Sequence, residues 1–536
     1  VLVITTTGPT PVDLLQSTTN RETLHSQSLH SHVDRMGSSD RVDTMPYAQK
    51  DAPIDISSAP NHEAATHPVS LHAKSWIEAW TPTALMVTYL VFSISLYTVL
   101  DSPATKVFWF LYLTIATLKA GITALEAYDG LTPLREARKA DEKATTATVK
   151  AEDQQDELPL VHLIFDSSDS EFSAPAELLA NIEYPDEKLA VTFLRSSQAP
   201  QRVPVIEYIG SSQQSRVRTM TLPTSCTGSL AARVAYSLDF DVLVPDASIT
   251  AVFGSDGRPH PQAIRRAAER FHQDTKLDVV NGRRILVPRS RRFGLSTVAG
   301  MLQDMLSALL QPGSAITWDL KRANESTAFW RTEALKAVAR AAASVTGDGH
   351  DLAWSSVACR CKADSDMRVI SYAPGPTAMT VYWNIVVNDA RKAALATLRY
   401  SSLAFEGLWI SQQPAGQKLN FKARVGVSYA LIASHLVSHA MLQYFCLAFS
   451  TLITNTPNSA SDLAQRIYFH HPVSEWLIIS GLICLGGTIA MLCRARSEFV
   501  PWHTIPAVVT LYPLILLLQA SVDVFGQFDA IAGHVA

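Results

Sequence analysis

The chain has 536 residues, of which 47% are hydrophobic and 18% are charged. Soluble proteins carry about 25% charged residues, so this composition favours a chain with membrane-spanning segments. Lysine and arginine number 45 against 49 aspartate and glutamate residues, and this balance argues against nucleic acid as a partner, because no broad basic field is present. The 6 cysteines are too sparse for a secreted disulfide scaffold, and Cys359-x-Cys361 lacks a second pair at zinc-site spacing.

Residues 1–74 are rich in Ser, Thr, His, Asp and Pro. Their apolar residues follow neither the helical nor the strand period, so no face of this segment could be buried against a core. The sequence therefore predicts a disordered N-terminal tail.

Five segments approach the roughly 20 apolar residues that a helix needs to cross a bilayer. They are residues 80–100, 106–127, 427–452, 476–492 and 505–522. Basic residues follow the second segment, precede the third and follow the fourth, and these three places share one side of a five-span topology. The sequence thus predicts a multi-pass membrane protein with a lipid bilayer, taken to be the plasma membrane, as a partner. The large middle domain is expected to be cytosolic.

Between the spans, residues 158–400 alternate short apolar, β-rich runs with helical patterns. The runs begin at Leu160, Leu189, Asp241, Ile249, Val279 and Met367, and the clearest helical pattern covers 261–271. Such alternation predicts an α/β domain with a mostly parallel sheet, whose ligands bind at the carboxyl ends of the strands. The remaining predicted parts are two transmembrane helices over 75–128, a charged linker over 129–157, an interfacial helix or connector over 401–425, three transmembrane helices over 426–525 and a tail over 526–536.

Six short segments resemble, in the same order, motifs of the membrane glycosyltransferases of family 2. That family includes the hyaluronan, chitin and cellulose synthases and the fungal capsular polysaccharide synthase-like proteins. The segments are YPDEKLAVTFL (184–194), ITAVFGSDG (249–257), DVVNGRR (278–284), ESTAFWRTEAL (325–335), GDGHDLA (347–353) and ATLRYSSLAFEGLW (396–409). The resemblance implies a GT-A type α/β glycosyltransferase domain inserted between N- and C-terminal transmembrane helices. It also implies a nucleotide-sugar donor, expected to be a UDP-sugar, a glycan acceptor, and Mg²⁺ or Mn²⁺ as cofactor.

The resemblance also implies roles for individual residues. Asp256 falls at the metal position, and with Arg195, Ser196 and Arg331 it is expected to bind the nucleotide sugar. The expected catalytic residues are Asp348 or Asp351 as the base that deprotonates the acceptor, together with Arg399 and Tyr400. Residues 399–409 are expected to form a helix near the membrane surface that brings Arg399 and Tyr400 to the mouth of the cleft.

Several acids of the family motifs are missing from this chain. Leu194-Arg-Ser-Ser stands where acids hold the nucleoside, Gly349 stands at the position of the base, and Ala396 replaces a glutamine. Arg195 could contact the diphosphate directly through its guanidinium, or it could be a solvated side chain at a strand end. Two interpretations of the whole chain therefore stay open: an active transferase, and a catalytically inactive relative that acts as a binding or scaffold partner.

Overall fold

The computed structural model describes most of the chain beyond residue 102. The described residues are 103–146, 158–166, 181–196, 205–208, 217–222, 229–240, 247–254, 256–288, 294–324, 327–343, 351–404, 419–454, 456, 458–459, 462, 486–487 and 489–535. All of them belong to one compact unit, Thr66–Ala536. The predicted tail over 1–74, the predicted span over 80–100, most of the predicted span over 476–492, and Asp348 lie outside the described residues.

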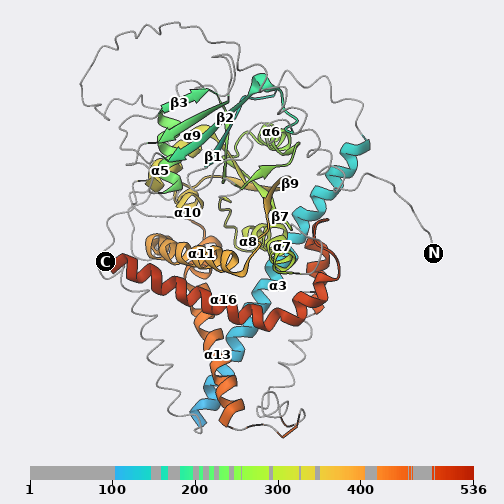
Figure 1. The fold of residues 1–536 in the computed structure, drawn as a ribbon, viewed down its shortest axis with the longest axis vertical. Coiled ribbons are helices and arrows are strands. Elements are labelled where there is room, and N and C mark those ends of the chain that lie inside the picture. The colour runs from blue at the N-terminus through green and yellow to red at the C-terminus, as the bar shows by residue number, and fades with distance from the viewer. Residues whose placement is uncertain are drawn as a thin grey trace, which may run out of the picture. The chain divides into compact units, whose positions relative to one another are not determined.

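The strands of the described residues form one mixed sheet in the order β3-β4-β2-β1-β5-β8-β7-β9-β6 (Figure 1). Their bounds are Val161–Asp166 (β1), Leu189–Ser196 (β2), Val205–Tyr208 (β3), Val217–Leu222 (β4), Ile249–Gly254 (β5), Arg258–Pro259 (β6), Val279–Val287 (β7), Ala328–Arg331 (β8) and Ala363–Pro374 (β9). β1, β2, β4 and β5 are mutually parallel, β7 is parallel to β9, and antiparallel β8 joins the two groups. All six parallel strands therefore end at one edge of the sheet.

Register fixes which residues meet at this carboxyl edge. Asp166, the last residue of β1, pairs with Leu194 of β2 on one side and with Gly254 of β5 on the other. The α/β prediction is confirmed, and β1, β2, β5, β7 and β9 each fall on a predicted run. The run that begins at Asp241 lies outside the described residues, and the sheet is mixed rather than mostly parallel.

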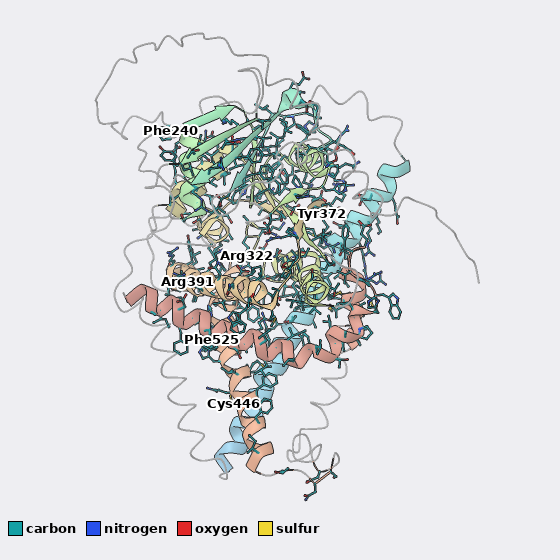
Figure 2. All side chains as sticks on the ribbon, in the orientation of Figure 1. Phe240, Arg322, Tyr372, Arg391, Cys446 and Phe525 are labelled. Carbon is teal, nitrogen blue, oxygen red and sulfur yellow. The ribbon has the colours of Figure 1, made fainter. Side chains whose placement is uncertain are left out.

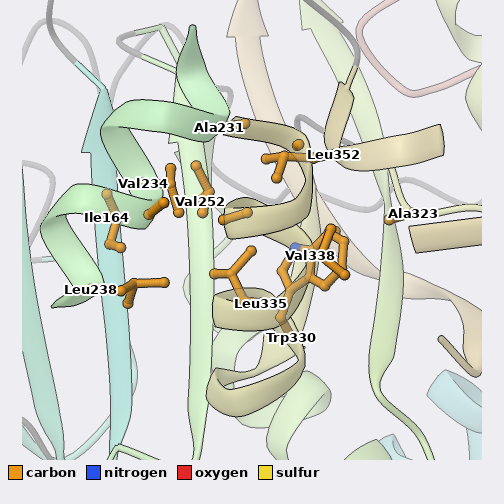
Figure 3. Packing of buried hydrophobic residues seen from close by; sticks show 14 of the residues in the cluster. Ile164, Ala231, Val234, Leu238, Val252, Ala323, Trp330, Leu335, Val338 and Leu352 are labelled. Carbon is orange, nitrogen blue, oxygen red and sulfur yellow. The ribbon is translucent and has the colours of Figure 1, made fainter. Parts of the chain in front are cut away.

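Each face of the sheet carries its own buried core, because successive side chains of a strand point to opposite faces. Ile164 and Val252 face the helices α5 (Leu230–Phe240), α9 (Thr332–Ala343) and α10 (Asp351–Ala358), as Figure 3 shows. Phe165 faces the other way and stacks at 5.4 Å between ring centroids on both Phe193 and Phe253, in the core that includes α6 (Ala263–Gln273). Strands buried on both faces read as continuous apolar runs, which explains why the sequence revealed them.

Helix α3 (Pro103–Thr146) contains the predicted span over 106–127 and continues well beyond it along the sheet domain. It crosses α8 (Gln311–Thr317) at a very close approach, where a Cβ on Gly130 would overlap the Leu309 carbonyl and one on Gly313 would overlap the Glu126 carbonyl. At the same crossing Trp318 Nε1 donates to Glu126 Oε1 at 2.7 Å. Glycines thus allow two backbones to touch, and a hydrogen bond fixes their register.

A buried charge pair joins the sheet to the segment that leads into the last helix. Arg283 of β7 donates through Nη2 to Asp304 Oδ1 at 3.1 Å and to the Ala495 carbonyl at 2.6 Å. Asp304 lies in α7 (Leu295–Met305), is fully buried, and accepts the Ser497 backbone N–H at 2.8 Å. Burial raises the pKa of Asp304, while Arg283 and Ser497 lower it. The connection that precedes the last helix is thereby anchored to the sheet domain.

The helices that follow the sheet include α11 (Met379–Tyr400), α12 (Phe421–Ser428), α13 (Ser434–Thr454) and α16 (Thr504–Val535). Among the described residues, Leu514–Ala532 of α16 is the single helix long and apolar enough to cross a membrane. The pair Phe421–Leu431 and His435–Gln443, bent by 45°, would add a second if both belonged to one span. The described part of the chain therefore does not support the predicted five-span topology.

Both halves of α16 contact the sheet domain or helices attached to it. Near its start, Ile505 and Val508 pack with Met301 of α7. Near its end, Asp529 pairs with Arg391 of α11 at 3.2 Å, and Phe525 meets Trp383 of α11 edge to face. Figure 2 labels Arg391 and Phe525. Both ends of α16 thus contact the same domain or helices attached to it, and these contacts do not favour the predicted fifth span over 505–522.

The helix predicted over 399–409 does not begin at Arg399, and residues 405–409 lie outside the described residues. Tyr400 is the last residue of α11, which begins at Met379, and a short 3-10 turn, Ser401–Leu403, follows it. Four loop residues, 375–378, separate the end of β9 from the start of this helix.

Candidate functional site

The carboxyl edge of the sheet is where the α/β architecture binds ligands, and the motif residue Asp256 lies there. It belongs to a tight turn that links β5 to β6, closed by a hydrogen bond of 3.0 Å from the Gly257 N–H to the Gly254 carbonyl. The glycines at both ends of the turn make room for it, and the Asp256 side chain is 44% exposed. The predicted placement of Asp256 at the end of the strand that begins at Ile249 is confirmed.

The Asp256 carboxylate already has a cationic partner. Arg284 of β7 donates through Nη2 to Asp256 Oδ2 at 2.8 Å. Arg284 is half-buried, and its own carbonyl accepts the Ser307 hydroxyl at 2.8 Å, so the backbone that carries it is fixed. The motif acid and the second arginine of the NGRR segment are therefore brought together across 28 residues of sequence.

Arg195 and Ser196 are the last two residues of β2, one strand beyond β1 on the same edge. Leu194 is fully buried and Arg195 is exposed, as strand alternation requires. Among the residues that the structure describes, the Arg195 side chain has no partner. Both residues thus reach the ligand-binding edge through β2, as their motif predicts.

A second ion pair at this edge was missed from the sequence. Asp166 is the last residue of β1. Arg233 of α5 donates two hydrogen bonds to its carboxylate, from Nε to Oδ1 at 3.1 Å and from Nη2 to Oδ2 at 2.5 Å. The two side chains are only 12% and 11% exposed. The signal was present, because a buried strand that ends on an acid at the carboxyl edge of a sheet is a candidate in its own right.

Asp351, one of the two candidate bases, is the first residue of α10. The next residue, Leu352, is buried in the cluster that includes Ala231 in the first turn of α5 (Figure 3). Since α5 follows β4, its first turn lies towards the carboxyl edge, and so does the start of α10. The structure thus brings Asp351 to the side of the sheet where Asp256 and Arg195 lie.

Two of the predicted residues lie elsewhere. Arg331 ends antiparallel β8 and pairs with Ile249, the first residue of β5, so it lies at the opposite edge of the sheet. Its guanidinium donates to the carbonyls of Leu277 at 2.7 Å and Thr275 at 2.9 Å. Arg331 therefore lies away from the expected nucleotide site, and its side chain holds the loop after α6 in place.

Tyr400 is fully buried rather than at a cleft mouth. Its hydroxyl shares a hydrogen bond of 2.8 Å with Ser355 Oγ of α10, and its ring packs in a cluster with Trp354 and Leu431. A sugar cannot stack on a ring that is covered on both faces. Arg399, next to it, is half-buried.

The described residues hold no preformed site for the expected Mg²⁺ or Mn²⁺. Mg²⁺ is held octahedrally by oxygen atoms, usually from carboxylates together with substrate phosphates. Among the described residues no group of three His, Cys, Asp or Glu side chains could hold a metal ion, and the Asp256 carboxylate is paired with a guanidinium. A divalent cation at Asp256 would have to displace Arg284 or share the carboxylate with it.

A cavity of about 450 Å³ lies at the other edge of the sheet, between α3, α6, α8 and the start of β9. Its charged residues are paired internally: Lys321 contacts Asp364 at 3.1 Å, Arg270 also contacts Asp364, and Arg368 contacts Asp366 at 2.6 Å. Burial raises the pKa of Asp364, but Arg270 and Lys321 outweigh it and hold the pKa below the usual value. This cavity is remote from the motif residues at the carboxyl edge.

No protein-family model matches the chain, and no curated protein matches it either. Solved structures do match. The mannosyltransferase PcManGT from Pyrobaculum calidifontis, in complex with GDP-Man and Mn²⁺, is 13% identical with a TM-score of 0.39, over 72% of this chain and 97% of that chain. S. aureus TarS 1–349 in complex with UDP-GlcNAc is 11% identical with a TM-score of 0.28, over 68% and 89%. Similarity of this degree does not assign the chain to a family.

Proposed function

We propose that this protein is a membrane-associated glycosyltransferase with a GT-A type domain, which transfers a sugar from a nucleotide sugar to a glycan or polysaccharide acceptor. One observation carries the proposal. The segments that resemble family 2 motifs form β2, β5 and β7, and they bring Arg195, Asp256 and Arg284 to the carboxyl side of one sheet. Nucleotide ligands bind at that side in sheets of this kind.

The transfer needs a base for the acceptor hydroxyl. Asp351, at the start of α10, is the candidate that the described residues supply, and Asp348 precedes it by three positions. A positioned carboxylate base contributes roughly 10²–10⁴ in rate. Tyr400 has no part in this proposal, since its ring is buried.

Membrane association belongs to the same proposal, with the sheet domain in the cytosol and the plasma membrane as the site. Its support is the apolar surface of α16, where Leu514, Phe525 and Phe528 are all more than half exposed, at 61%, 60% and 53%. Large apolar side chains gathered on one helix indicate a lipid or protein partner.

The test is direct. Purified full-length protein in lipid nanodiscs is given a panel of nucleotide sugars that includes UDP-GlcNAc and GDP-Man, and both binding and release of the nucleoside diphosphate are measured. We expect at least one donor to bind and to be consumed. The double variant Asp348→Asn with Asp351→Asn should bind that donor normally but turn it over about 100-fold more slowly or worse. Glu333→Gln, an exposed acid in the first turn of α9, is the matched control.

The alternative is a catalytically inactive relative that binds nucleotide sugar or supports a partner protein. The pairing of Asp256 with Arg284 and the glycine at position 349 favour it. Donor binding without turnover in the wild-type protein would select this alternative. Absence of donor binding would exclude the transferase and leave only support of a partner protein.

A further inference from the structure

We propose that the Arg284 guanidinium, held in place by Asp256, binds the diphosphate of the nucleotide sugar in place of a divalent cation. The inference rests on the proposed function and names the binding mode of that site.

The first support is the state of Asp256. In this chain a single carboxylate remains in the GSDG turn, and that carboxylate accepts Arg284 Nη2 at 2.8 Å. A divalent cation is attracted by the negative charge of a carboxylate and binds its oxygen lone pairs. Here the Arg284 guanidinium offsets that charge and donates to one of the two oxygens, so the carboxylate attracts a cation less strongly.

The second support is the fixed position of Arg284. Its residue pairs with Ser371 in the β7–β9 ladder, and Ser307 binds its carbonyl at 2.8 Å, so the Cα cannot move without breaking the sheet. Among the described residues, Asp256 is the one acceptor found for its side chain, through one of five N–H donors. The Arg284 side chain is 29% exposed, so part of it is accessible to a ligand.

The third support is the positive charge around the turn. Arg258, in the strand that follows Asp256, is exposed. Arg195 is exposed at the end of β2, two strand spacings from β5, or about 10 Å at about 4.8 Å each. Arg284 lies in β7, four spacings from β2, so a nucleotide sugar that contacted both arginines would extend across β1, β5 and β8. Guanidinium groups bind phosphate oxygens in a bidentate manner, and they need no metal to do so.

The two binding modes predict opposite effects of one substitution. If a metal bridges Asp256 and the diphosphate, Asp256→Asn removes a ligand and binding is lost. If Arg284 binds the diphosphate, Asp256→Asn removes a negative charge beside the phosphates and keeps an oxygen acceptor for Arg284. Affinity should then be unchanged or higher.

The experiment is calorimetric titration of the full-length protein in nanodiscs with the nucleotide sugars UDP-GlcNAc and GDP-Man, first with EDTA and then with MnCl₂. We expect equal affinity in the two conditions. Arg284→Gln should weaken binding in EDTA by roughly 10- to 100-fold, the usual value of a hydrogen bond to a charged group, and Asp256→Asn should not weaken it. The control is Arg340→Gln. It breaks the exposed ion pair between Arg340 of α9 and Asp239 of α5 and should leave the affinity unchanged.

Arg284→Lys keeps the positive charge and is the second variant in case Arg284→Gln fails to fold. Its affinity should lie between those of the wild type and Arg284→Gln. Binding that requires Mn²⁺, or loss of binding in Asp256→Asn, would overturn the guanidinium mode and leave the proposed function standing. Failure of the wild-type protein to bind either donor in both conditions would overturn the proposed function together with this inference.

Discussion

The role that a sequence motif assigns to a side chain has to be checked against the contacts of that side chain. Tyr400 occupies a motif position, and a sequence motif gives no information on whether a ring is covered. In the structure it is fully buried between α10 and the helices that follow α11, with its hydroxyl bound to Ser355 at 2.8 Å. Its contribution is therefore to stability rather than to acceptor binding.

We expect Tyr400→Ala to lower the free energy of unfolding by about 3–5 kcal/mol, as other buried aromatic-to-alanine changes do. Tyr400→Phe should cost only about 1 kcal/mol, because it removes a hydrogen bond and keeps the ring. Chemical denaturation followed by intrinsic fluorescence measures both. A Tyr400→Ala protein with wild-type stability and lost sugar transfer would restore the acceptor role.

The Arg283–Asp304 pair permits a second prediction at the residue scale. Both side chains are buried, and their bonds also hold Ala495 and Ser497. Because each charge would be left uncompensated without the other, Arg283→Met or Asp304→Leu alone should destabilise the protein by about 3–5 kcal/mol. The double variant should cost less than the sum of the single ones. Additive effects in thermal unfolding would show that the two charges do not depend on each other.

At the scale of elements, the crossing of α3 and α8 depends on two glycines. A Cβ on Gly313 would overlap backbone atoms of α3, whereas no atom of the described residues lies within 4 Å of a Cβ on Gly121 of α3. Backbone atoms cannot give way as a flexible side chain can, so the two helices would have to separate.

We expect Gly313→Ala to destabilise the protein by about 1–3 kcal/mol or more, the usual cost of overpacking. Gly121→Ala should be neutral or stabilising, because alanine is the better helix former by about 1 kcal/mol. Melting temperatures of the two variants in the same detergent provide the comparison. Equal effects of the two substitutions would mean that the helices are not in close contact there.

Strands and helices differ in how well the sequence revealed them. β1, β2 and β5 are nearly continuous apolar runs, a local pattern that depends only on burial on both faces. β7 has apolar residues at both ends and NGRR in its middle. β3, β4 and β8 were not predicted, because β8 is short and β4 alternates buried with half-buried residues. Their place is decided by pairing with neighbours far away in sequence.

At the scale of the whole molecule, the length and apolarity of α16 suggested a membrane crossing. Its 32 residues would extend about 48 Å at 1.5 Å per residue, more than enough to span a bilayer. Yet its first turns pack on α7, which adjoins β7, and its last turns pack on α11, which contacts α10 (Figure 1). A helix held at both ends by one domain lies along that domain.

We therefore expect both ends of α16 to be accessible from the side of the sheet domain. His503→Cys and Ala532→Cys, each in a background with Cys446 and Cys493 replaced by serine, should react with a membrane-impermeant maleimide added from that side. Phe240→Cys, exposed on α5 at 44%, is the positive control. Reaction of the two ends from opposite sides would re-establish α16 as a span.

The sequence by itself determined the α/β character of the middle domain, most of its long strands and the edge where Asp256 lies. These follow from local patterns, since a run of apolar residues forms a strand whatever lies beyond it and a strand delivers its last residues to a fixed edge. Only the tertiary structure decided that Asp256 pairs with Arg284 and that the Tyr400 ring is buried. It also decided that Arg331 lies at the edge opposite the carboxyl ends of the parallel strands and that both ends of α16 contact the domain. Each of these depends on contacts between residues far apart in the chain, and no local pattern records such contacts.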